Sequence, residues 1–130
     1  MNTEDFITYD QAVKLKELGF DWKCYTFYHW DNWCGLSDSG ICENHNMFEK
    51  CFSAPTLSQA QKWLREVKDI IVLATCNLDY EKGHEWYWFV DKDVDIEDPE
   101  HFYETYEQAL STAIDKALDL LTQPNNGNQD

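Results

Sequence analysis

The stretch TYEQALSTAIDKALDLL, residues 105–121, decides the fold of this chain. Its apolar side chains recur at alternating steps of three and one residues, the spacing of one buried face on an α-helix. The opening Thr has the position of a helix cap, and Pro124 cannot continue a helix. We therefore expect a helix that ends before Pro124 and buries Tyr106, Ala109, Leu110, Ala113, Ile114, Ala117, Leu118 and Leu121.

The helix-start motif T-x-x-Q-A occurs twice more, at 8–12 and 56–60. In such a capping box the Thr hydroxyl accepts from the amide three residues on, and the Gln side chain bonds back to the amide of the Thr. Gly19 suits the left-handed end of the first helix. The second helix follows Pro55 and carries an apolar stripe. Because helix starts produce this motif independently, the three copies do not require an internal duplication.

Between the first two helices, residue usage switches to strand formers. Residues 24–30 are rich in aromatic side chains, and Asp31-Asn32 is a turn that leads into a second strand at 33–36. A further turn is expected at 38–40 and a third strand at 47–52. This part of the chain therefore predicts three short antiparallel strands.

After the second helix, residues 70–76 are nearly all apolar and predict a central strand, with 86–90 as its partner. The order α-βββ-α-ββ-α predicts a two-layer α+β fold, with an antiparallel sheet of about five strands and three helices mainly on one face. We expect one domain over 1–123 and a disordered tail at 124–130. The expected core includes Leu64, Val67, Ile71, Leu73, Ala113, Ile114, Leu118 and Leu121.

Charge restricts the possible partners. The chain has 10 Lys and Arg against 25 Asp and Glu, a net charge of −15. Phosphate backbones and anionic membranes repel such a chain, so neither nucleic acid nor membrane is an expected partner. A basic protein is attracted instead. Without an apolar span, a secretory signal or paired cysteines, the sequence predicts a cytoplasmic protein with reduced thiols.

Three blocks of sequence also carry a family resemblance: Thr8 to Phe20, Ala54 to Glu66, and the closing TYEQA helix. In these blocks the chain resembles an uncharacterised family of small acidic proteins encoded by prophages and mobile elements of gut anaerobic bacteria. The resemblance covers residues 4–121 and rests on helix starts and packing residues. It implies an accessory role in a mobile element, and it carries over no catalytic or ligand residues.

Four residues have the chemistry of zinc ligands. Cys34, Cys42, His45 and Cys51 follow the pattern C-x7-C-x2-H-x5-C. Structural zinc sites draw their ligands as close pairs, and only Cys42 and His45 have such spacing. Ordinary buried thiols are therefore the preferred interpretation, with no metal and no cofactor expected.

Two other kinds of site have incomplete patterns. Asp91 to Asp95 opens like a calcium loop, but Ile96 stands where the loop needs Gly and Phe102 where it needs Glu. The residue pairs His84–Glu85 and His29–Cys34 lack any surrounding catalytic motif. We therefore expect a solvated acidic connection, no catalytic residues and no enzyme activity.

The remaining candidates are acidic and aromatic residues that would bind a partner. The acidic set is Asp91, Asp93, Asp95, Glu97 and Asp98, and the aromatic set is Trp30, Trp33, Trp86 and Trp88. Alternation puts Trp86, Trp88 and Val90 on one strand face and Tyr87 and Phe89 on the other, without deciding which face is covered. The leading hypothesis is a non-enzymatic protein that binds a basic protein through an acidic and aromatic surface. The alternative is a small-ligand- or metal-binding domain that uses the aromatic face or the Cys/His cluster.

Overall fold

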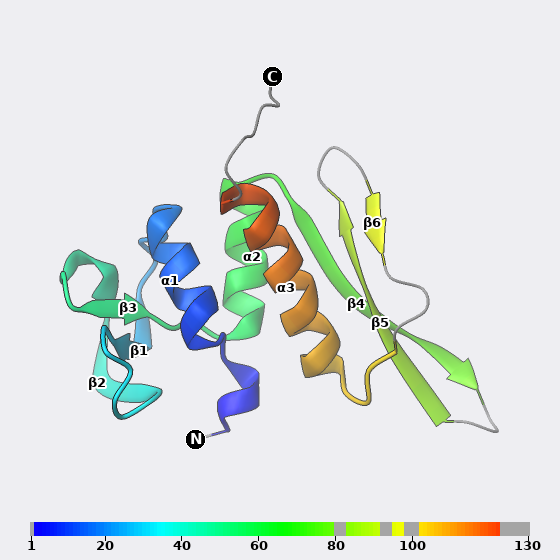
Figure 1. Cartoon of the computed structure of the whole chain (residues 1–130), viewed down its shortest axis with the longest axis horizontal. Coiled ribbons are helices and arrows are strands. Elements are labelled where there is room, and N and C mark those ends of the chain that lie inside the picture. Colours follow the sequence, from blue (N-terminus) through cyan, green and yellow to red (C-terminus); the bar gives the residue numbers. More distant parts are fainter. Residues whose placement is uncertain (1, 80–82, 92–94, 98–101, 123–130) are drawn as a thin grey trace.

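Three helices occupy the middle of the molecule, and a small antiparallel sheet lies on each side of them (Figure 1). The computed structural model describes residues 2–79, 83–91, 95–97 and 102–122. The strand order is β2-β1-β3 in the first sheet and β4-β5-β6 in the second. In chain order the elements are η1 (Thr3–Asp5), α1 (Tyr9–Glu17), β1 (Cys24–His29), β2 (Ser37–Glu43), η2 (His45–Met47), β3 (Cys51–Ser53), α2 (Leu57–Val67), β4 (Ile71–Asp79), β5 (Gly83–Asp91), β6 (Asp95–Glu97) and α3 (Tyr106–Thr122).

The α+β class and the order α-βββ-α-ββ-α predicted from the sequence are confirmed. The structure adds β6, which pairs with β5, and it divides the strands between two sheets where one was expected. Helix α3 contacts β4 and β5, and α1 contacts β3, so the helices separate the two groups of strands (Figure 1). The expected disordered tail at 124–130 lies outside the described residues.

The Thr of each T-x-x-Q-A motif caps a helix. At α1 the capping box is complete, because Gln11 donates its amide to Thr8 Oγ1 at 3.2 Å and accepts from the Thr8 amide at 2.8 Å. At α2 and α3 the Thr hydroxyl also accepts from the amide three residues on, at 3.1 Å. There Gln59 and Gln108 bond elsewhere, so the reciprocal bond predicted for all three starts is present in α1 only. Gly19 takes φ +90°, as its position after α1 predicts.

The buried side chain of Gln11 joins α1 to α3. Gln11 is 0 % exposed, and its Nε2 donates to Asp115 Oδ1 at 2.7 Å and to the Ser111 carbonyl oxygen at 3.0 Å. Further along both helices, Lys14 Nζ lies 2.6 Å from Asp119 Oδ1. A buried amide without partners would be destabilising, so these bonds fix the position of α1 on α3.

The buried face of α3 forms the centre of the core, as its spacing predicts. Six of its residues are 0 % exposed: Ala109, Leu110, Ala113, Ile114, Ala117 and Leu118. Tyr106 and Leu121 are partly buried against them. The strands contribute Val72, Trp88 and Val90 to the same core.

Three residues expected in the core are exposed, and this part of the prediction is wrong. Val67 is 51 %, Ile71 40 % and Leu73 46 % exposed, whereas Ile70 and Val72 are buried. Helices cover one face of the second sheet only, so alternate residues of β4 point away from the core. Val67 is the last residue of α2, beyond the turn that carries the buried Leu64.

The first sheet differs from the prediction in where its strands turn. Residues 33–36 connect β1 to β2 instead of forming a strand, because Gly35 takes φ +71° and interrupts the extended backbone. The predicted turn at 38–40 is an irregularity inside β2, where the pairing register with β1 shifts and Gly40 takes φ +75°. Of the strand predicted at 47–52, only the last two residues belong to β3.

We predict that Leu118→Ala lowers the free energy of unfolding by about 2–5 kcal/mol, because it removes buried methyl groups and leaves a cavity. Leu120 is the matched control, since it lies on the same helix and is 39 % exposed. Leu120→Ala should change stability by about 0.5 kcal/mol or less. Urea denaturation measures both variants, and equal effects would contradict the docking of α3 on this face.

We also predict that Asp115→Asn stabilises the protein slightly at neutral pH. Partial desolvation of its carboxylate against α1, together with the nearby Asp119 carboxylate, raises the pKa of Asp115, against the hydrogen bond from Gln11. The folded state therefore binds this proton more tightly than the unfolded state, and its stability falls as pH rises through the folded pKa. The difference between variant and wild type should vanish below the unfolded pKa of about 3.9. Denaturation at several pH values tests this, and an Asn variant less stable at neutral pH would contradict it.

Candidate binding surface

The four candidate zinc ligands occupy different environments. Cys34 and Cys42 are exposed, Cys51 is partly buried and His45 is 3 % exposed. Within the described part of the chain, no three His, Cys, Asp or Glu residues are grouped so that they could hold a metal ion. The structure therefore gives the metal-binding alternative no site to build on among these residues.

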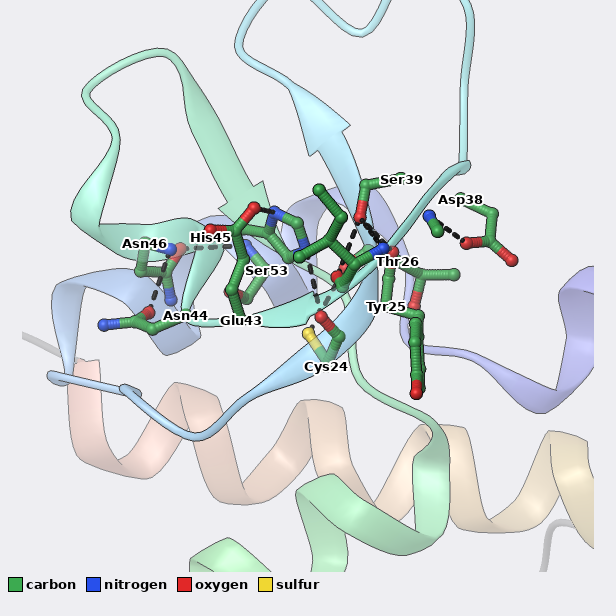
Figure 2. Close-up of polar contacts among 12 residues, drawn as sticks. Cys24, Tyr25, Thr26, Asp38, Ser39, Glu43, Asn44, His45, Asn46 and Ser53 are labelled. Atoms are coloured by element: carbon green, nitrogen blue, oxygen red, sulfur yellow. Dashed lines mark hydrogen bonds and ion pairs between the residues drawn. The ribbon is translucent and has the colours of Figure 1, made fainter.

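The polar groups around His45 have a structural role in the first sheet (Figure 2). His45 Nε2 lies 2.9 Å from the carbonyl oxygen of Cys24, and since that oxygen can only accept, Nε2 carries the proton. The His45 ring also stacks on Phe27, with 5.0 Å between ring centroids. Nearby, the Ser53 amide donates to Asn46 Oδ1 at 2.8 Å. These contacts hold η2 against β1 and β3.

Of the two candidate catalytic pairs, only His29–Cys34 lies wholly in the described part of the chain, and there the two side chains bond to other residues. His29 Nδ1 lies 2.9 Å from Asp31 Oδ1, and Cys34 Sγ lies 3.5 Å from Ser37 Oγ. The His84 side chain is outside the described part of the structure.

The helices cover the face of β5 that carries Trp88 and Val90. Trp88 is 2 % exposed and Val90 0 %, so this face packs against the helices. Trp86 is on the same face, partly buried, with its ring 5.5 Å from that of Tyr106. Tyr87 alternates to the opposite face. Trp86 and Trp88 therefore belong to the packed side of the strand.

The opposite side of β4 and β5, which we call the outer face, carries large apolar side chains together with polar and acidic ones. It comprises Ile71, Leu73, Thr75, Glu85, Tyr87, Phe89 and Asp91, with Phe102 beside Tyr87. Leu73 pairs with Phe89 and Thr75 with Tyr87 in the register. Leu73 is 46 % and Phe102 44 % exposed. An exposed group of large apolar side chains is typical of an interaction site.

Acidic residues lie at both ends of the outer face on β5. Glu85 and Asp91 alternate with Tyr87 and Phe89 along the strand, so they share its face. In the backbone register, Asp95 of β6 pairs with Asp91 and Glu97 with Phe89. Asp93 and Asp98 lie outside the described residues. The three strands of the second sheet contain no Lys or Arg, so their charge has a single sign.

Trp30 and Trp33 are exposed but belong to the other side of the molecule. They follow β1 in the first sheet, across the helices from β5 (Figure 1). Trp30 is 51 % and Trp33 75 % exposed, and the Trp30 carbonyl oxygen accepts from the Tyr9 hydroxyl. The aromatic residues named from the sequence are therefore not brought together on one surface.

Sequence reasoning missed Ile71, Leu73 and Phe102 as surface residues. Ile71 and Leu73 could have been placed from the partner strand, because directly paired residues share a face and β5 alternates clearly between its two faces.

Comparisons with protein-family models, curated proteins and solved structures find no match. None of the helices within the described residues has the length and apolar character needed to cross a membrane.

We predict that the purified protein contains less than one zinc per chain and five thiols that titrate after denaturation. In the native protein the exposed Cys34 and Cys42 should react first with a thiol reagent. Cys24 should react last, because burial hinders access and raises the pKa of its thiol. One zinc per chain by elemental analysis, lost on Cys42→Ser, would contradict this prediction.

Proposed function

We propose that this protein is a non-enzymatic binding protein whose partner is a basic protein, held by the outer face of the second sheet. The observation that carries the proposal is the exposure of Ile71, Leu73 and Phe102 on a face whose described strand residues include acids and no Lys or Arg. An accessory role in a prophage or mobile element, which the family resemblance of the sequence would imply, is part of this proposal.

Apolar and charged residues contribute differently to such binding. Covering Leu73 and its neighbours removes apolar surface from water, which supplies contact energy. The acids raise the rate of encounter with a positively charged partner and disfavour phosphate backbones. A protein partner suits a strand pair better than a small ligand does, because small ligands bind in concave sites.

We predict that Leu73→Lys weakens binding to a basic partner by about ten-fold or more, because it removes buried apolar contact and adds a like charge. A labelled synthetic peptide that alternates Lys and Val is the probe, measured by fluorescence anisotropy. Ile41→Lys is the matched control, since Ile41 is 60 % exposed on β2 in the first sheet. Equal weakening by both variants would contradict a binding site on the outer face.

The contribution of the acidic residues is tested separately. Asp93→Lys with Asp95→Lys should leave folding intact and weaken binding of the same peptide. Glu4→Lys with Asp5→Lys makes the same change in net charge at η1, on exposed residues, and should have a smaller effect. Wild-type affinity should fall steeply as salt is added. Affinity that is unaffected by salt and by both double variants would contradict the electrostatic part of the proposal.

A further inference from the structure

Strand β4 is one edge of the second sheet. The order β4-β5-β6 leaves it paired with β5 on one side only, and among the described residues no strand pairs with its other side. β5 is covered on both sides, by β4 on one and by β6 and a bridge between Trp86 and Tyr103 on the other. The long edge that remains open to a further strand is therefore that of β4.

The other sheet edges carry features that discourage strand pairing, whereas on β4 the only contact of this kind among the described residues is the one that Gln61 of α2 makes with the Val72 carbonyl oxygen. β3 and β6 have 3 residues each, and β2 is broken by the irregularity at Gly40. Short or bulged edge strands are common protections against unwanted pairing, as are edge prolines and charges. β4 has 9 residues, and its first eight, 71–78, contain no Gly, Pro or charged side chain.

The direction of the backbone groups on this edge follows from the bridge on the far side of β5. Trp86 exchanges both backbone hydrogen bonds with Tyr103, so its paired residue Cys76 has its own backbone groups on the side of β4 away from β5. Val72 shares this side by alternation, and its carbonyl oxygen accepts from Gln61 Nε2 at 2.7 Å. In an antiparallel pair both backbone groups of a residue point to the same side, and the side alternates along the strand. The amides of Ala74 and Cys76 therefore also point to the open edge.

We propose that an extended segment of the basic partner adds to this edge as a further strand of the second sheet. The inference rests on the proposed function and specifies how the partner binds. Main-chain hydrogen bonds to β4 would provide affinity, and alternate side chains would lie beside Ile71 and Leu73 on the outer face. A second copy of the chain fits less well, because each copy carries a net charge of −15 and would bring further acids to this face.

Backbone methylation of the probe tests strand addition directly. The alternating Lys–Val peptide is made in two further forms, each N-methylated at every second residue but in opposite frames. One frame removes the amides that face β4, and it should weaken binding by about ten-fold or more, while the other keeps those amides. Equal affinity of the two frames would overturn strand addition. Failure of the unmethylated peptide to bind would instead count against the proposed function.

A backbone variant of the protein gives the second test. Ala74→Pro removes an edge amide that does not bond to β5, and Pro is tolerated at such positions. It should abolish discrimination between the two methylated frames, with a thermal unfolding midpoint close to that of the wild type. Strand addition would be overturned if Ala74→Pro kept its affinity for the peptide and still distinguished the two methylated forms. Loss of binding in Leu73→Lys would then show that the partner contacts the outer face without pairing with β4. A dimer of the free protein that Ala74→Pro dissociates would also overturn the proposal, by assigning the edge to a second copy.

Discussion

The close packing of α3 against its neighbours is the constraint on which the rest of the structure depends. The alanines at every fourth position, Ala109, Ala113 and Ala117, are fully buried. Their side chains are short, so neighbouring elements can approach this helix closely. Helix α3 therefore contacts α1, α2, β4 and β5 at once. Because the helices cover one side of the second sheet, Trp88 and Val90 are buried there and Ile71 and Leu73 are left exposed.

An exposed apolar face lowers solubility without adding to the stability of the isolated chain, so its presence calls for a role. The side chains on this face are large, and the acids beside them have one sign. A basic partner would cover the apolar surface and neutralise part of the local charge together. This combination distinguishes the second sheet from the first, where the exposed Trp30 and Trp33 follow β1 and the β2 edge is irregular.

Local sequence signals predicted the helices well, because caps and periodic apolar residues act within a few positions. Thr8, Thr56 and Thr105 all cap helices where expected. The face of β4 was not predictable in this way, since residues 70–76 are apolar at almost every position and give no alternation to read. The division into two sheets depends on long-range pairing, which propensity does not encode. For the same reason the sequence did not separate the packed Trp86 and Trp88 from the exposed Ile71 and Leu73 of β4.

The buried Gln11 amide has a consequence for how reproducibly α1 and α3 assemble. A row of alanines repeating every four residues looks almost the same after a slide of one helical turn, about 5.4 Å, so apolar packing alone discriminates poorly between alignments. The row that meets α1 is less repetitive, because it runs from Ser111 through Asp115 to Asp119. A slide would change the acceptor that faces Gln11 and the one that faces Lys14. These two donors therefore select one relative position of α1 and α3 along their axes, among several positions in which the apolar packing has a similar energy.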